Sequence, residues 1–173
     1  MPRLILQAMN SPYSVAQADR DSNRNHPASR LLRLAGRLPW RLQGMVMSQV
    51  LSAAFAQNLQ AHELAFLEDR VVEIHVRDLD LRWRLSARAR RIVAVGPDVA
   101  PDTTFRGDAS ALVALANRRA DPDTLFFQRR LLIEGDTELG LHLKNWLDTL
   151  EPEQLPAPVR VALSAAERLF PLP

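Results

Sequence analysis

The sequence of 173 residues contains no cysteine. This absence excludes disulfide bonds, thiolate zinc sites and cysteine nucleophiles, and it is compatible with a reducing cytoplasm. Lysine is nearly absent as well, because Lys144 is the one lysine among 22 cationic residues. The positive charge therefore resides mainly on arginine, whose rigid guanidinium group suits phosphate as well as surface ion pairs.

Signatures of enzymes are also missing. The sequence has no Gly-x-Ser-x-Gly elbow and no glycine-rich phosphate loop. His75, Asp78 and Asp80 resemble part of a metal site, but no further histidine lies at a ligand spacing, and aspartates in turns commonly cap their own backbone. Glu134 and Asp136 stand at a strand-to-helix junction, where capping explains them better than paired acid catalysis. We therefore expect a non-catalytic protein without metal or cofactor.

Acidic and basic residues nearly balance, with 20 against 22, so the formal net charge is only +2. The sequence pI is nevertheless about 9.9, and the arginines form local clusters. These clusters are Arg88, Arg90 and Arg91, then Arg118 and Arg119, then Arg129 and Arg130. No aromatic residue is interleaved with them as a stacking platform for bases. We therefore do not expect nucleic acid as a partner.

The start of the chain lacks the pattern of a secretory signal. Its apolar patch consists of residues 4–6 alone, and a polar run follows from Asn10 to His26. Residues 1–27 are predicted to form a flexible arm, and the protein is expected in the cytoplasm.

The stretch from Ala28 to Pro39 has the pattern of an amphipathic helix. Arg30, Arg33 and Arg37 recur at helical spacing, with leucine and alanine on the other side. Helices of this kind lie in membrane interfaces, but an ordinary helix packed on the domain has the same pattern. The three arginines are our candidates for contact with a membrane surface, which would make the protein peripheral at the inner membrane.

A run without charges follows from Leu42 to Ala61. Its many glutamines and serines argue against a transmembrane span, because each would leave water without a dedicated partner. We expect a helix that is buried on the sheet or against a second subunit, which leaves a homodimer open.

The middle of the chain changes to the period of strands. Apolar and polar residues alternate from Val72 to Val76 and again from Leu81 to Leu85. The link between them is too short for a crossover, so this pair is expected to be antiparallel. Three further elements are expected at Arg91–Val95 (strand), Thr103–Arg106 (strand) and Asp108 or Ser110 to Asn117 (helix).

The region from Asp121 to Glu151 predicts a strand and a helix. The strand covers Leu131 to Glu134, and Asp136 or Thr137 is expected to cap the helix. One apolar stripe runs along this helix, formed by Leu139, Leu143, Trp146, Leu147 and Leu150. An amphipathic helix is also expected from Pro158 to Phe170. Together these elements predict an α+β fold with an antiparallel-rich five-stranded sheet covered by helices.

The segment Asp121 to Leu150, with Gly-Asp-Thr-Glu-Leu-Gly at 135–140, resembles the sterol carrier protein two-like lipid-binding domain of the UbiT family. That family consists of bacterial ubiquinone-biosynthesis accessory factors. Two further stretches, Phe66–Arg70 and Ile74–Trp83, are similar to the same family. The resemblance implies that residues 28–151 form the lipid-binding domain, with an apolar cavity between sheet and helices, and that residues 152–173 form an appended C-terminal helix.

The same resemblance implies a lipid carrier that supports oxygen-independent ubiquinone biosynthesis. Its expected partners are ubiquinone or its isoprenoid precursors, phospholipids, the membrane surface and peptidase-like iron–sulfur hydroxylases. Seven residues are our candidates for the lining of the cavity or the core: Leu115, Phe126, Phe127, Leu139, Leu143, Trp146 and Leu150. The alternative is a protein-interaction module with a filled core and no lipid, because a filled interior requires the same apolar stripes as a hollow one.

Overall fold

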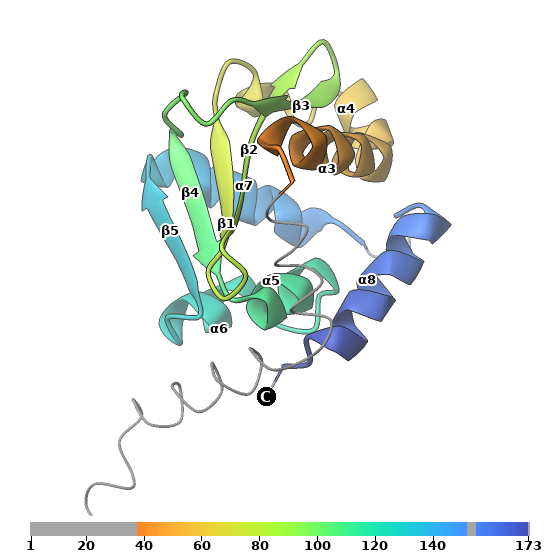
Figure 1. Ribbon diagram of the computed structural model, residues 1–173, viewed down its shortest axis with the longest axis vertical. Helices are drawn as coiled ribbons and strands as arrows, with labels where there is room; N and C mark the ends of the chain where they lie inside the picture. Colours follow the sequence, from red (N-terminus) through yellow and green to blue (C-terminus); the bar gives the residue numbers. More distant parts are fainter. Residues whose placement is uncertain (1–37, 152–154, 173) are drawn as a thin grey trace, which may run out of the picture.

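The computed structural model describes residues 38–151 and 155–172, which form one five-stranded sheet with helices on one side (Figure 1). The predicted arm lies outside the described residues, as does the predicted helix with Arg30, Arg33 and Arg37. The elements in chain order are α3 (Trp40–Ala54), α4 (Ala56–Gln60), the 3₁₀ helix η1 (Ala65–Leu67), β1 (Val72–Val76), β2 (Leu81–Arg88), β3 (Arg91–Val95), β4 (Thr103–Gly107), α5 (Ala109–Ala116), α6 (Pro122–Phe127), β5 (Leu131–Gly135), α7 (Thr137–Thr149) and α8 (Ala157–Leu169).

The strands lie in the order β3-β2-β1-β4-β5. The pairs β1–β2, β2–β3 and β4–β5 are antiparallel, whereas β1 and β4 are parallel. The predicted antiparallel-rich sheet is thus confirmed, with one parallel pair that the sequence pattern did not reveal. This pair forms because β3 occupies the position beside β2, so that the chain returns to the free edge of β1 before β4 begins.

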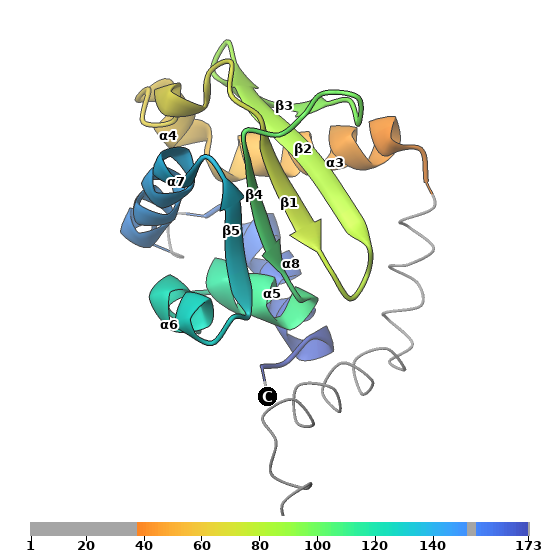
Figure 2. The same cartoon turned by 90° about the vertical axis from the view of Figure 1, so that its left-hand side faces the viewer.

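Side chains of alternate polarity divide the sheet into an inner and an outer face. On the inner face, Trp83, Ile74, Phe105 and Ile133 are consecutive partners from β2 to β5 and form one apolar row. The outer face carries the polar residues between them. Figure 2 looks onto this outer face, over which none of the described helices lies.

Two glycines allow helices to lie close to the inner face. A Cβ atom at Gly44 in α3 would be 2.5 Å from the Cβ atom of Ala94 in β3, closer than real Cβ atoms approach. A Cβ atom at Gly140 in α7 would overlap the side chain of Ile133. Helix α3 therefore packs on β3 and β2, and α7 packs on β4 and β5.

The junction of β5 and α7 explains the Gly-Asp-Thr-Glu-Leu-Gly segment. Gly135 has a φ of 91°, and a Cβ atom there would overlap the carbonyl oxygen of Asp102. Asp136 accepts a hydrogen bond from the backbone N–H of Leu139 at 3.0 Å, so Asp136 is the N-cap. Its carboxylate also pairs with Arg70. The predicted capping role of Asp136 is therefore confirmed.

The charge-free run forms two helices, because α3 ends at Ala54 and α4 begins at Ala56. Gly44 is the one buried residue of α3. The predicted packing of this run on the sheet is therefore confirmed for α3. No second layer among the described residues covers its other side, and a second subunit there stays a prediction.

Candidate functional site

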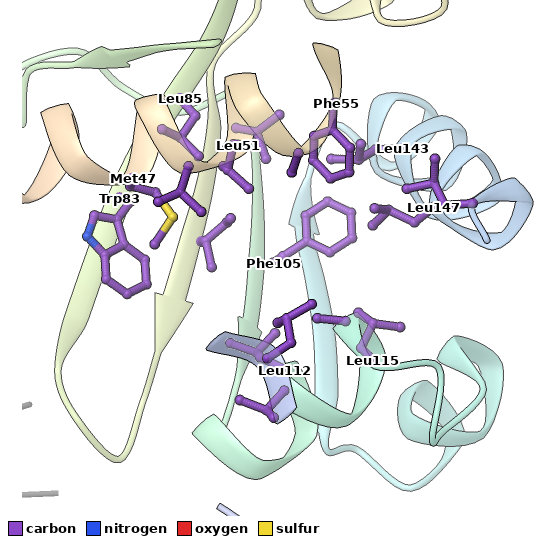
Figure 3. Close-up of a pocket in the computed structure, with 18 of the residues that line it drawn as sticks. Met47, Leu51, Phe55, Trp83, Leu85, Phe105, Leu112, Leu115, Leu143 and Leu147 are labelled. Atoms are coloured by element: carbon purple, nitrogen blue, oxygen red, sulfur yellow. The ribbon is translucent and has the colours of Figure 1, made fainter. Parts of the chain in front are cut away.

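A cavity of about 680 Å³ lies between the inner face of the sheet and the helices α3, α5, α7 and α8. Figure 3 shows side chains from four sides pointing toward one shared space. They belong to α3 (Met47, Leu51, Phe55), the sheet (Trp83, Leu85, Phe105), α5 (Leu112, Leu115) and α7 (Leu143, Leu147). Apolar atoms thus dominate its surface, which is the chemistry that holds a hydrocarbon.

The hollow interior changes the burial of central residues. Ile74 lies in the middle of the sheet, and Leu112 lies on the helix facing it, yet both are only partly buried. Both side chains line the cavity. In a close-packed interior such positions would be covered by neighbouring atoms. The inner face of the sheet is therefore incompletely covered by the chain itself.

Charged residues in the cavity lining come from the adjoining ends of α5, α6 and α7. They are Arg118, Asp121, Asp148 and Glu151. Arg118 has a φ of 53° and donates a hydrogen bond to the carbonyl oxygen of Leu150. Asp121 caps α6, and the hydrogen bond from the backbone of Thr124 lowers the pKa of this carboxyl group. The apolar cavity therefore has one charged end.

Helix α8 forms the outermost wall. It contributes Val159, Leu163 and Ala166 to the lining, and no residue within the helix is fully buried. Two polar contacts hold it against α5: the side-chain amide of Asn117 donates to the carbonyl of Leu163 at 3.1 Å, and Arg119 pairs with Glu167 at 3.0 Å. These contacts attach the wall to the residues that follow α5.

Phe170 anchors the end of this wall. It follows α8 and is only 4% exposed. Its ring packs in a small cluster with Val76, Leu79, Leu81 and Ala109. Phe170 therefore attaches the end of α8 to this cluster.

The seven candidate lining residues divide into three groups. Leu115, Leu143, Trp146 and Leu150 line the cavity. Leu139 is buried in the core and does not contribute to the lining.

Phe126 and Phe127 form the third group. They are 45% and 82% exposed and lie outside the lining. Their helix α6 has a single inward side, which Pro122 and Leu125 occupy. The two phenylalanine rings therefore point to solvent, where they contact each other at a centroid distance of 6.1 Å.

An exposed apolar stripe runs along α3. It consists of Leu42, Met45, Val46 and Val50, which are 43% to 57% exposed. Val50 also lines the cavity, so the stripe is continuous with the interior. At the other end, the guanidinium group of Arg41 lies 5.6 Å from the ring centre of Trp40. No helix in the described residues is both long and apolar enough to cross a membrane.

The residues considered for metal binding serve the fold. Asp78 accepts a hydrogen bond from the backbone N–H of Ala109 at 2.9 Å, and Asp80 is 3.9 Å from Arg82. Within residues 38–151 and 155–172, no group of three histidine, aspartate or glutamate side chains is arranged to hold a metal ion. Glu134 pairs with Arg106 on the outer face at 3.1 Å.

Comparisons with known proteins agree with this architecture. The model of the SCP-2 sterol transfer family matches residues 48–148. The ubiquinone biosynthesis accessory factor UbiT of Escherichia coli (strain K12) is 51% identical over 125 residues, which are 72% of this chain and 71% of that protein. The chain belongs to the UbiT family of SCP-2 proteins. UbiT of Escherichia coli O157:H7 gives the same identity and coverage.

The fold of this UbiT-family chain also occurs in a solved structure. The UbiJ-SCP2 ubiquinone synthesis protein superposes with a TM-score of 0.53 at 19% identity. The match covers 64% of this chain and 96% of that protein. This similarity shows the fold that the resemblance implied.

Several lining residues of the UbiT-family chain were not among the sequence candidates. Ile74, Trp83 and Phe105 line the cavity from the sheet, and Ala166 lines it from α8. The alternation of the strands did place Ile74 and Trp83 on one face, and the C-terminal helix was predicted to be amphipathic. The missing information was the side of the sheet on which the helices pack.

Proposed function

We propose that this protein is a non-catalytic lipid carrier that acts as an accessory factor in ubiquinone biosynthesis. The observation that carries the proposal is the apolar cavity of about 680 Å³. Membership of the UbiT family supports the pathway, because the relatives carry the name of ubiquinone biosynthesis accessory factors. The cargo is ubiquinone, an isoprenoid precursor of it, or a membrane phospholipid.

The volume of the cavity limits the cargo. A group of the size of a water molecule takes about 30 Å³, so the cavity accommodates on the order of twenty methylene-sized groups. This capacity suits one medium-length hydrocarbon tail. A longer isoprenoid tail has to leave the cavity at its open side or displace α8.

The energetics of transfer favour a carrier. Moving about fifteen methylene groups out of water stabilises the bound state by on the order of 12 kcal/mol, at about 0.8 kcal/mol each. In a cell the competing environment is a bilayer, in which the tail is already dry. The net transfer free energy is therefore close to zero, and the protein can both load and unload. Selectivity then arises from the charged end of the cavity and from its shape.

Loading from a bilayer follows from the position of the exposed stripe on α3. The stripe leads to Val50, which is shared with the cavity lining. Tryptophan and arginine at the start of α3 are typical anchors at a membrane interface, here Trp40 and Arg41. We place the bilayer against α3, with α8 as the movable wall, and the protein as peripheral at the membrane. The arginines at 30, 33 and 37 precede this helix and would extend the contact.

Flotation of the protein with anionic vesicles tests this route. Val46 is 57% exposed, and Val46→Glu places a charge in the middle of the stripe. We expect vesicle binding to weaken about ten-fold, because one apolar side chain leaves the interface and a charge enters it. Leu141→Glu is the matched control, since Leu141 is 53% exposed on α7 and does not line the cavity. Equal binding of wild type and Val46→Glu would refute the docking of α3.

Size-exclusion chromatography of the same variants tests a homodimer through α3. A dimer that dissociates in Val46→Glu would assign the stripe to a second subunit instead of a bilayer.

Delivery within the pathway requires protein partners as well. We propose oxygen-independent ubiquinone biosynthesis as the context and peptidase-like iron–sulfur hydroxylases as partners. The exposed pair Phe126 and Phe127 is apolar surface that such a partner would cover.

A further inference from the structure

The outer face of the sheet carries a row of three basic side chains. His75 in β1 is the direct partner of Arg82 in β2 and of Arg106 in β4. Because adjacent strands are about 4.8 Å apart, the two arginines flank the imidazole ring on both sides. Figure 2 looks onto this face, and the described helices lie behind it. The cavity and the stripe on α3 belong to the opposite side of the sheet.

Two nitrogen atoms in this row are buried and unpaired. His75 is only 7% exposed, yet its Nδ1 atom has no hydrogen-bond partner among the described residues. The Nε atom of Arg106 is in the same condition. Buried polar atoms in folded proteins are almost always hydrogen-bonded. Two unpaired nitrogens on neighbouring residues therefore point to an acceptor that the described chain does not supply.

The neighbouring row shows the contrast. Arg84 and Glu73 are partners two residues along the same strands, and Arg84 Nε is 2.7 Å from Glu73 Oε2. Arg84 also donates hydrogen bonds to the carbonyl oxygens of Pro97 and Val99. The protein thus engages Arg84 through Nε and Nη1, and Arg84 neutralises Glu73, the one buried carboxylate among the described residues of the outer face.

The arginines beside His75 are less completely paired. Arg82 Nε is 3.9 Å from Asp80 Oδ1, and the two side chains are 51% and 87% exposed. Arg106 uses Nη2 for Glu134, at 3.1 Å, which leaves its Nε unused. Exposed ion pairs of this kind are weak and leave the guanidinium groups able to turn toward another acceptor.

The electrostatic potential at His75 is positive. Burial is the main cause that lowers the pKa of His75, and the charges of Arg82 and Arg106 lower it further. Glu73 and Asp80 raise the pKa by smaller amounts. The arginines therefore outweigh the carboxylates at the imidazole, and the site favours a negative guest.

We propose that Arg82, His75 and Arg106 bind a soluble phosphate-type oxyanion on the outer face of the sheet. The anion accepts hydrogen bonds from Arg106 Nε, from the guanidinium group of Arg82 and from His75 Nδ1. Guanidinium groups match the geometry of phosphate oxygens, which favours this class of ligand. A lipid in the cavity keeps its headgroup on the inner side of the sheet. The ligand on the outer face is therefore a soluble molecule.

Binding is coupled to protonation of the imidazole. A dianion beside His75 raises its pKa, because it stabilises the charged form. The protonated ring in turn donates from both nitrogens, so the complex is tighter in mild acid than in mild base. The charged groups that face His75 are those of Arg82 and Asp80, Arg106 and Glu134, and Glu73 with Arg84.

Calorimetric titration with sulfate at constant ionic strength tests this site. Sulfate keeps a double negative charge across neutral pH, so a change in affinity between about pH 5.5 and about pH 8 reports the protein. We expect saturable binding that is several-fold tighter at the lower pH. Arg82→Gln should weaken it about ten-fold, the loss of one charge-assisted contact. Arg88→Gln is the matched control, because Arg88 is exposed on the same face of the same strand.

His75→Gln provides a second variant that keeps a hydrogen-bonding side chain. We expect it to bind sulfate with little dependence on pH. Absence of saturable binding at the lower pH in wild type would overturn the proposal, as would equal affinities of wild type and Arg82→Gln. A nuclear magnetic resonance titration of the His75 ring adds a direct readout. Its pKa should rise on saturation with sulfate, and an unchanged pKa would contradict contact with the anion.

Discussion

Replacing Ala166 with tryptophan should block the cavity without removing any existing contact. Ala166 lies on α8, is partly buried and lines the cavity. Its neighbour Ala165 is exposed and lies outside the lining. The pair Ala166→Trp and Ala165→Trp therefore introduces the same side chain at adjacent positions of one helix. Both variants have the same cost in helix propensity, and only one of them competes with a lipid tail.

The expected magnitude follows from the volume of the cavity. An indole group adds about nine non-hydrogen atoms to the alanine side chain, the bulk of roughly nine methylene groups. The cavity of about 680 Å³ holds on the order of twenty such groups, so tryptophan takes almost half of the space. Tail atoms displaced into water lose at most about 7 kcal/mol, at about 0.8 kcal/mol each. Even a fifth of this value, about 1.4 kcal/mol, is a ten-fold loss of affinity.

The assay is retention of a lipid with a fluorescent tail, measured after dilution into empty vesicles. Wild type and Ala165→Trp should retain equal amounts, and Ala166→Trp should retain at most a tenth. Circular dichroism of both variants controls for folding. Equal retention by wild type and Ala166→Trp would refute a tail-binding site between α8 and the sheet. Equal loss in both variants would assign the effect to the helix and not to the cavity.

Three further predictions concern the fold. Gly135→Ala should lower the unfolding free energy by about 1–3 kcal/mol in urea denaturation, because Gly135 combines a φ of 91° with a backbone oxygen at the Cβ position. The control Gly96→Ala should change the unfolding free energy by less than about 0.5 kcal/mol. The hydrogen bond from the backbone of α7 lowers the pKa of Asp136, against a rise from burial, and Arg70 lowers it further. The stabilising carboxylate is therefore present above about pH 4 and is lost as the pH falls through its folded pKa, so Asp136→Asn should lose less stability than wild type between about pH 4 and pH 2. Leu125→Ala should lower the unfolding free energy by about 2–5 kcal/mol, because Leu125 is only 1% exposed. Phe127→Ala should lower the unfolding free energy by less than about 0.5 kcal/mol and leave lipid retention unchanged, because Phe127 is 82% exposed.

The fold was largely predictable where the local sequence pattern reflects which side chains are buried. Alternation from Val72 to Val76 and from Leu81 to Leu85 located the β1–β2 hairpin, since strand period and a short link fix an antiparallel pair. Asp136 with the stripe of α7 located that helix. The parallel pairing of β1 with β4 was not predictable, because it depends on β3 filling the edge beside β2. Nothing in the local pattern of Thr103 to Gly107 predicts that β1 is the parallel neighbour of β4.

The candidate site was less predictable than the fold. Phe126 and Phe127 are apolar and follow a buried leucine, so the sequence placed them in the interior. It gives no sign that only Pro122 and Leu125 of the short helix α6 face the core. The hollow interior also leaves no mark in the sequence, since the stripe through Leu143 and Trp146 is the same in a filled core. Spatial proximity of α3, α5, α7 and α8 created the site, and this proximity depends on contacts that are distant in the chain.

Mass spectrometry of an organic extract of the purified protein is the most direct test of a lipid carrier. A protein of similar size without an apolar cavity, purified from the same host, serves as the control for adventitious lipid. We predict near-stoichiometric quinone, isoprenoid precursor or phospholipid in the extract of wild type and much less in that of Ala166→Trp. An extract without lipid, even after incubation with vesicles that contain ubiquinone, would contradict the account and favour a protein-interaction module.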